Sequence, residues 1–345
     1  MKFSSLNTSK IIPPKWIIKH IMESGTVSLL FGDSFCGKTY VALKLAYSVM
    51  TGKNFACYPV KKKGTVLYLC GEGRSGIERR LRALEIATGE SVSDRFLISD
   101  TSASLVDEYH KDTTEILSDK PPSLLDAIKQ AGEEFNEPVL FIIDTWARNL
   151  GGDENSAQDT GNAIAEIDRI RVQFPNIAVL IVHHTGQTAK DRARGSYSLK
   201  CAVDVEMQLD KDKNDNVARL TFTKMKDGDV PDPIAFRFRS ISLNIFDEDG
   251  EELCSSIVEP TEYIAPVKSG TACTGKNQTK AKEVLFELMK SKPEDQKWIS
   301  RDEWKTTCIA RGINGNRFNQ TITPLIEHDY VRHEDGKYTI DLPFD

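Results

Sequence analysis

An eight-residue segment, 32–39, constrains the fold of this chain more than any other, because its sequence GDSFCGKT fits the pattern G-x-x-x-x-G-K-[ST]. A strand-like apolar segment, Thr26–Phe31, precedes it, and a helix-like segment without Gly or Pro, Tyr40–Met50, follows it. Glycines let successive backbone N–H groups turn toward one anion, and the helix presents its positive dipole end to that anion. The segment therefore predicts a loop that binds the phosphates of a nucleoside triphosphate.

Two side chains of this loop have predicted roles. Lys38 reaches the β- and γ-phosphates, and the hydroxyl of Thr39 ligates the Mg²⁺ that accompanies ATP. We therefore expect ATP as the ligand and Mg²⁺ as the cofactor. The predicted nucleotide-binding residues are Gly32, Asp33, Ser34, Phe35, Cys36, Gly37, Lys38, Thr39 and Tyr40.

The chain has 345 residues and a formal net charge of −6, which argues against a surface coated with basic residues for non-specific nucleic-acid binding. A local basic patch or an inner basic channel stays compatible with that charge. Seven cysteines without a C-x-x-C pair indicate a reducing, cytoplasmic environment. The N-terminal sequence lacks the apolar core of a signal peptide, and no apolar run is long enough to span a membrane.

Residues 26–210 alternate apolar runs with helix-like stretches, which predicts a doubly wound α/β fold around a mainly parallel sheet. The expected strands are Val27–Phe31, Thr65–Cys70, Phe96–Ser99, Val139–Asp144 and Ala178–His183. The expected helices are Tyr40–Met50, Gly76–Ala87, Leu124–Phe135 and Thr160–Phe174.

Turn residues separate four short alternating segments between 203 and 246, which predict an antiparallel meander that extends the sheet: Val205–Leu209, Val217–Thr223, Ile234–Phe238 and Ile241–Phe246. The predicted core spans 26–255 and follows an entry segment, 1–25. Residues 256–278 contain Pro, Gly and Ser with little periodicity, which indicates a linker. Residues 279–345 have the pattern of a small α+β domain. Its expected helices are Lys280–Lys290, Arg301–Ala310 and Asn316–Asp329, and a short hairpin follows them.

Two acidic residues lie at or just after the ends of predicted strands. Asp144 can hold Mg²⁺ through water, together with Thr39, and the alternative is an acid that caps the next turn. Glu72 follows Thr65–Cys70 and is a candidate general base that polarises the attacking water. The alternative for Glu72 is a carboxylate in a surface turn.

A predicted strand that ends at the adjacent histidines 183 and 184 leads into a basic loop. His184 is a candidate sensor of the γ-phosphate and not a metal ligand, because no cluster of Cys or carboxylate residues at ligand spacing accompanies it. The loop carries Lys190, Arg192 and Arg194. Three roles stay open for it: a solvated loop, a contact to DNA, or an arginine finger that acts on the nucleotide of the next subunit.

With these motifs in this order, the chain resembles the RecA-fold helicases, and most closely the plasmid RepA-type hexameric replicative helicases. The resemblance covers roughly residues 15–250. Beyond the phosphate loop, the motifs that carry it are Gly71-Glu72-Gly73, Ile143-Asp144-Thr145, Gly152-Asp153-Glu154-Asn155, His183-His184-Thr185-Gly186 and Arg194-Gly195-Ser196.

The resemblance implies a RecA-like core and a role for each matching residue. Glu72 would be the general base, Asp144 the acid of the Mg²⁺ site, and His184 the residue coupled to the γ-phosphate. Arg194 would be the finger that acts across the subunit interface. Lys224 and Lys226 are similar to the Lys-x-Arg finger of DnaB-like helicases, although Lys226 stands where that pattern has Arg and cannot make the same planar contact. Their alternative is the charged edge of a hairpin.

The C-terminal domain departs from the RepA-type pattern and resembles a winged helix. Between Lys305 and Ile326 the sequence has no acidic residue, while Arg311, Arg317 and several Asn, Gln and Thr residues suit contacts to phosphates and base edges. Pro324 lies in the expected recognition helix, where it costs helix stability. The implied partners are duplex DNA or, alternatively, a replication protein.

The implied function is an ATP-hydrolysing, ring-forming DNA helicase that replicates a plasmid, a phage or an integrated element. Its basic loops would move along single-stranded DNA in a homo-oligomer, expected to be a hexamer. One alternative is a recombination-type or clock-type RecA-fold ATPase without unwinding activity. Another is a DNA-binding initiator or regulator whose oligomeric state ATP switches.

Overall fold

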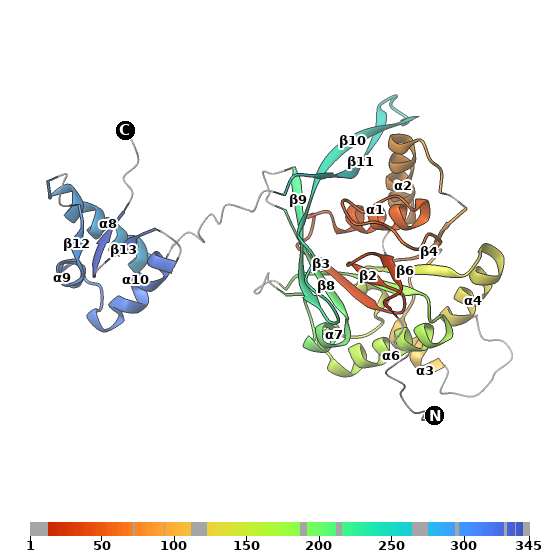
Figure 1. Ribbon diagram of the computed structural model, residues 1–345, viewed down its shortest axis with the longest axis horizontal. Coiled ribbons are helices and arrows are strands. Elements are labelled where there is room, and N and C mark those ends of the chain that lie inside the picture. The colour runs from red at the N-terminus through yellow and green to blue at the C-terminus, as the bar shows by residue number, and fades with distance from the viewer. Residues whose placement is uncertain are drawn as a thin grey trace. The chain divides into compact units, whose positions relative to one another are not determined.

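The computed structural model describes residues 13–71, 73–92, 94–111, 123–186, 192–211, 216–263, 275–293, 297–327, 330–334 and 336–340. The chain divides into two compact units, Met1–Tyr263 and Ile264–Asp345. Each unit has its own hydrophobic core and is described by itself (Figure 1).

Among the described residues of the first unit, nine strands form one sheet in the order β11-β10-β9-β8-β3-β7-β6-β4-β5. The six strands from β8 to β5 run parallel to one another. They are β3 (Val27–Gly32), β4 (Thr65–Cys70), β5 (Phe96–Ile98), β6 (Pro138–Asp144), β7 (Ala178–His184) and β8 (Val205–Lys211). Every residue of β3, β4 and β6 is buried, as expected for strands covered on both faces. The predicted α/β fold with a mainly parallel sheet is confirmed.

Three antiparallel strands extend the sheet beyond β8: β9 (Val217–Met225), β10 (Ile234–Phe246) and β11 (Glu252–Thr261). Two predicted strands, Ile234–Phe238 and Ile241–Phe246, are one continuous strand, because Arg239 and Ser240 between them pair with β11. Residues 256–261 were expected in the linker and form the second half of β11. Pro260 fits there, since β11 is an edge strand of the sheet and Pro has no N–H to pair.

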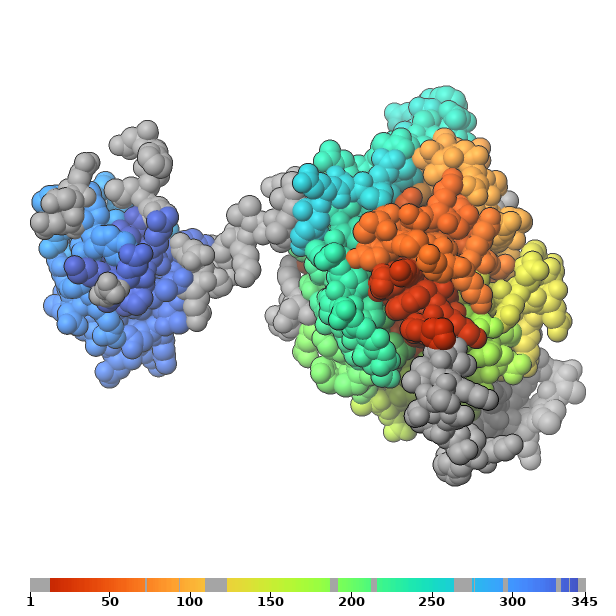
Figure 2. All heavy atoms as spheres, viewed as in Figure 1, coloured from red at the N-terminus to blue at the C-terminus, as the bar shows by residue number. Residues whose placement is uncertain are grey.

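Helices cover both faces of the sheet and create two apolar layers. On one face pack α1 (Lys38–Thr51), α2 (Arg74–Thr88) and the β1–β2 hairpin (Trp16–Ile18 and Met22–Glu23). On the other face pack α3 (Leu105–Lys111), α4 (Leu124–Phe135), α5 (Trp146–Asn149), α6 (Ala157–Gln173) and α7 (Tyr197–Ala202). The β10–β11 hairpin bends over α1 and α2, and Figure 2 shows its atoms directly against theirs.

The second unit orders its elements as helix, strand, two helices and a hairpin. They are α8 (Lys276–Lys290), β12 (Ile299–Ser300), α9 (Arg301–Ala310), η3 (Gly315–Arg317), α10 (Phe318–Glu327), β13 (Arg332–Glu334) and β14 (Lys337–Thr339). The three strands form an antiparallel sheet in the order β12-β14-β13. Trp304 is fully buried at its centre, packs on Phe318 and Tyr338, and donates a 2.8 Å hydrogen bond to the Ala281 carbonyl. Pro324 lies inside α10, which runs on to Glu327.

Candidate functional site

The phosphate loop connects β3 to α1 at the carboxyl edge of the sheet. Two of its glycines are required by close approaches. A Cβ on Gly32 would lie 2.2 Å from the carbonyl oxygen of Leu209, and one on Gly37 would lie 2.3 Å from the ring of Phe238. Gly37 also has a φ of 101°, a left-handed conformation that glycine adopts at low cost. Phe35 shares such a conformation, with a φ of 65°, and its side chain is 99% exposed at the surface of the loop.

The Lys38 side chain is buried beneath the loop, and its ammonium group donates to the backbone carbonyls of Gly32 and Asp33 at 3.1 and 2.8 Å. The same nitrogen lies 3.3 Å from Nδ1 of His184. Because an ammonium can only donate, Nδ1 accepts in this contact. The strand that ends at His184 thus directly contacts the lysine of the G-x-x-x-x-G-K-[ST] pattern.

Asp144 ends β6 beside the start of α1, with its side chain buried. Its Oδ2 accepts a 2.9 Å hydrogen bond from the hydroxyl of Thr39 and a second, shorter one from the phenol of Tyr68. Burial and the charge of Asp144 hold the pKa of Tyr68 well above its usual value, so the phenol stays a donor. A hydroxyl and a carboxylate side by side are hard oxygen ligands of the kind that Mg²⁺ prefers. The residues present therefore fit the predicted ion.

The segment after β7 folds back onto the phosphate loop. The Thr185 hydroxyl donates to the carboxylate of Asp33, and its backbone N–H donates to the Gly32 carbonyl at 3.1 Å. His183 is fully buried, and its Nε2 donates to the Arg194 carbonyl at 2.9 Å. Burial lowers the pKa of His183 to about 4, so this imidazole is neutral and its contact to the loop persists at neutral pH.

Two sequence motifs meet in a single contact at Arg194. Its guanidinium forms an ion pair with Glu154: Nε lies 2.5 Å from Oε1, and Nη2 donates a hydrogen bond to Oε2 at 3.0 Å. The backbone N–H of Ser196 donates to the Glu154 carbonyl at 2.8 Å. Gly195 has a φ of 90°, and a Cβ on it would lie 2.5 Å from that carbonyl oxygen. Each position of the Arg-Gly-Ser motif therefore makes a contact within its own chain.

A cavity of 580 Å³ opens over the phosphate loop. Four of its lining residues were not predicted: Arg80 of α2, Thr145 after β6, Lys211 at the end of β8 and Phe238 of β10. They belong to elements distant in sequence from the loop. Thr145 lies in the Ile143-Asp144-Thr145 motif, and the sequence contexts of the other three carry no motif. The other described residues that line it are Ser34, Phe35, Gly37, Lys38, Thr39, Tyr40 and His184.

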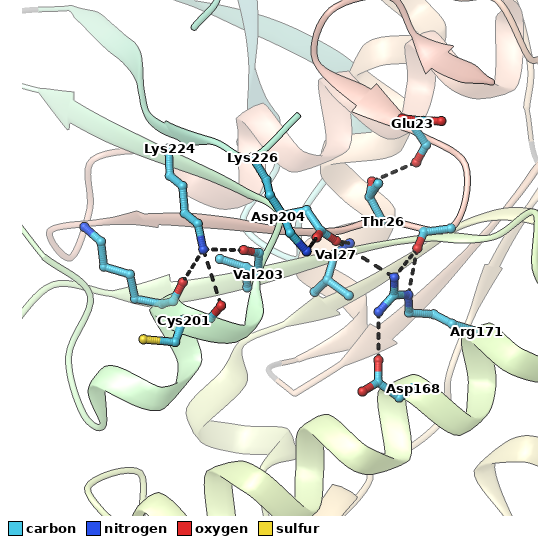
Figure 3. Close-up of polar contacts among 12 residues, drawn as sticks. Glu23, Thr26, Val27, Asp168, Arg171, Cys201, Val203, Asp204, Lys224 and Lys226 are labelled. Carbon is cyan, nitrogen blue, oxygen red and sulfur yellow. Dashed lines mark hydrogen bonds and ion pairs between the residues drawn. The ribbon is translucent and has the colours of Figure 1, made fainter. Parts of the chain in front are cut away.

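Lys224 and Lys226 lie at the opposite, amino edge of the sheet (Figure 3). The end of β9 pairs with the start of β8, as Met225 faces Val205, and the start of β8 pairs with that of β3. The Lys224 ammonium donates to the carbonyls of Val203 and Lys200 at 2.6 and 2.8 Å, at the C-terminus of α7. Lys226 forms a 3.4 Å ion pair with Asp204. Within this chain, neither lysine faces the phosphate loop.

The remaining predicted site residues differ in what the structure says of them. Glu72 and Lys190 lie outside the described residues. Arg192 is exposed, and its carbonyl accepts a 3.3 Å hydrogen bond from the Gly186 N–H. In the second unit, Arg311 forms a 2.7 Å ion pair with Glu287, and Arg317 is exposed at the end of η3.

The comparisons with known proteins agree with this geometry. A family model described as an AAA domain matches residues 1–190, which include the phosphate loop, Asp144 and His184. A search of curated proteins found no match to the chain. In the part of the chain that the structure describes, no helix has the length and apolar character needed to cross a bilayer.

Proposed function

The chain belongs to the AAA domain family of P-loop ATPases, and from that premise we propose that it is a ring-forming DNA helicase or translocase driven by ATP hydrolysis. Its work would be the replication of a plasmid, a phage or an integrated element. The observation that supports the ATPase step best is the convergence of Lys38, Thr39, Asp144 and His184 at one edge of the sheet. They come from three different strand ends and meet at the loop that binds phosphate.

Each of these residues takes a defined part in the proposed reaction. Lys38 would shift from the loop carbonyls to the β- and γ-phosphate oxygens and offset their charge. Thr39 and Asp144 would hold Mg²⁺, which neutralises charge on the phosphates when bound. Glu72 remains the proposed general base. His184 contacts Lys38, so movement of that lysine on loss of the γ-phosphate would reach the strand end and the loop that follows it.

Arg194 is proposed as a finger that stabilises transition-state charge in the neighbouring subunit. A mixture of two inactive variants tests this role. Arg194→Ala lacks the finger and Glu72→Gln lacks the base, yet mixed rings contain some interfaces with both groups intact. Mixing should restore part of the ATPase activity. If mixed oligomers form and stay as inactive as either parent, Arg194 does not act in trans.

DNA is the proposed partner of the second unit, since its order of helices, short strand and terminal hairpin resembles that of a winged helix. Arg317 and Arg311 are exposed and available to a polyanion, although Arg311 would exchange its partner Glu287 for a phosphate. Deleting residues 271–345 should then weaken duplex binding more than single-strand binding. Unchanged duplex affinity would favour docking to a replication protein.

A second candidate function is an ATP-switched DNA-binding regulator, and one observation favours it. Arg194 already has an ion-pair partner, Glu154, within its own chain, which a purely structural arginine would also have. The two functions separate in one assay. A helicase hydrolyses ATP faster with single-stranded DNA and unwinds a forked duplex, whereas a regulator changes its oligomeric state with ATP and does neither.

A further inference from the structure

The cavity over the phosphate loop is larger than a triphosphate site requires, and a distinct part of its wall comes from outside the loop. Its 580 Å³ lies in the range of sites that enclose a whole small-molecule ligand. Tyr40, Arg80, Lys211 and Phe238 line it together with the phosphate-binding residues. A wall shared in this way points to a single ligand with two chemically different ends.

Phe238 is fixed relative to the loop. The tip of its ring lies where a Cβ of Gly37 would be, so the ring packs on the glycine itself. Its backbone is bonded on both sides to Asn216: its N–H donates to the Asn216 carbonyl at 3.0 Å, and its carbonyl accepts from the Asn216 amide at 2.8 Å. The β10 strand thereby fixes the position of the Phe238 ring relative to the phosphate loop.

The rings of Tyr40 and Phe238 form a corner. Their centroids are 5.6 Å apart and their planes cross at 86°. A cation lies over each ring: Arg80 Cζ is 4.8 Å from the Tyr40 centroid, and Lys211 Nζ is 4.7 Å from the Phe238 centroid. Both rings are only half-buried, so part of their surface faces the cavity. Flat aromatic faces beside guanidinium and ammonium groups are the surroundings in which proteins stack nucleobases.

We propose that the Tyr40–Phe238 corner, with Arg80, is the nucleobase site of this ATPase and that it recognises the base by stacking. The inference rests on the proposed function, since the phosphates must occupy the loop for the base to reach the corner. None of the described residues lining the cavity has a carboxylate or an amide side chain, and the two cations that could read a guanine edge, Arg80 and Lys211, lie over the ring faces instead. The site therefore takes purine nucleoside triphosphates as a class, and ATP and GTP bind alike.

Inorganic tripolyphosphate supplies the test, because it has the phosphate chemistry of the ligand without the base. Binding of ATP, GTP and tripolyphosphate, each with Mg²⁺, is measured calorimetrically on the full chain and on two variants, Phe238→Ala and Phe238→Tyr. Phe238→Ala should weaken ATP binding by roughly 5- to 150-fold, the effect of losing one base stack, and leave tripolyphosphate binding unchanged. Phe238→Tyr keeps an aromatic face and should keep ATP affinity. Unchanged tripolyphosphate binding also shows that the variant is folded.

Three results would overturn the proposal. Phe238→Ala could leave ATP affinity unaltered, or it could weaken ATP and tripolyphosphate equally, which would make Phe238 a support of the loop. Wild-type protein could bind ATP more than about tenfold tighter than GTP, which would require a polar contact to the base edge. Failure of the proposed function has a different signature: wild-type protein then binds neither ATP nor tripolyphosphate.

Discussion

The two edges of the central sheet carry similar residues and use them differently. At the carboxyl edge, Lys38 and Thr39 line a cavity at the N-terminus of α1, and Asp144 accepts a hydrogen bond from the Thr39 hydroxyl. At the amino edge, Lys224, Arg171 and Asp204 contact backbone groups of the chain itself (Figure 3). Residue type alone therefore does not identify a ligand site. What differs is that the residues at the carboxyl edge lie at a cavity of 580 Å³.

The amino edge shows how complete such internal pairing can be. The Asp204 carboxylate accepts a 2.9 Å bond from the Val27 N–H, and the Arg171 guanidinium donates to the Gly25 carbonyl at 2.7 Å. Arg171 also pairs with Asp168 at 2.7 Å. These contacts fix the segment that leads into β3, the strand that positions the phosphate loop at its other end. We infer that this edge is structural and that the carboxyl edge binds the ligand.

Among the substitutions that test this difference between the two edges, one at Asp144 should have the largest effect. Asp144→Asn keeps the size of the side chain and an oxygen that accepts from Thr39, but it removes the charge offered to Mg²⁺. We expect ATP turnover to fall by roughly 10²–10³-fold, about 3–4 kcal/mol in the activation barrier. Steady-state hydrolysis at saturating ATP and Mg²⁺ measures it. Turnover within a few-fold of wild type, about 1 kcal/mol or less, would reduce Asp144 to a turn cap.

The free energy of unfolding should depend on pH because His183, which anchors the loop after β7, is buried. In the unfolded chain this imidazole takes up a proton below about pH 6.5, whereas the folded chain resists protonation until its pKa of about 4. The free energy of unfolding should therefore fall as pH drops from about 6.5 to 4, by up to about 3 kcal/mol from this group. His183→Gln keeps a donor without titrating, and urea unfolding at both pH values should show a correspondingly smaller fall. An equal fall in both proteins would place the acid sensitivity elsewhere.

A substitution of Lys224 tests whether the amino edge is structural. Lys224→Met keeps the aliphatic stem and removes the charge that donates to the C-terminal carbonyls of α7. We expect a loss of about 1–2 kcal/mol in the free energy of unfolding, measured by urea denaturation. A variant as stable as wild type would contradict the structural assignment, as would a loss of ATP binding in a protein that remains folded.

Lys226 should give the smallest effect and serves as the matched control. Its side chain is 62% exposed, and its ion pair with Asp204 spans 3.4 Å. Exposed pairs of this kind contribute little, so Lys226→Met should change stability by less than about 0.5 kcal/mol. The same urea titration decides it. A change as large as that of Lys224→Met would mean that the ion pair between Lys226 and Asp204 contributes more to stability than its exposure suggests.

Much of the fold could be predicted from the sequence because its central strands are continuous apolar runs. Thr65–Cys70 and Arg301–Ala310 match β4 and α9 residue for residue, and the phosphate loop lies where its pattern placed it. Elements that depend on distant partners were missed. The six-residue α7 is held by Lys224 from another strand, and β11 is a polar strand defined by its pairing with β10.

The same distinction between local patterns and distant contacts applies to the candidate site. Residues with local motifs were identified, and the structure joins Lys38, Thr39, Asp144 and His184. The phenol of Tyr68 and the Phe238 ring had no local signal, because each acts through a contact between segments far apart in sequence. The pairing of Glu154 with Arg194 was visible only as two separate motifs.

The same substitution at the two edges tests the central claim most directly. ATP affinity is measured by calorimetry for wild type, Lys38→Met and Lys224→Met, with urea unfolding alongside to confirm that each is folded. Lys38→Met should bind ATP at least roughly tenfold more weakly, the loss of one charge-assisted contact, whereas Lys224→Met should stay within about twofold of wild type. Equal ATP affinity in the folded Lys38→Met protein and wild type, or a comparable loss in Lys224→Met, would contradict the assignment of the nucleotide to the carboxyl edge.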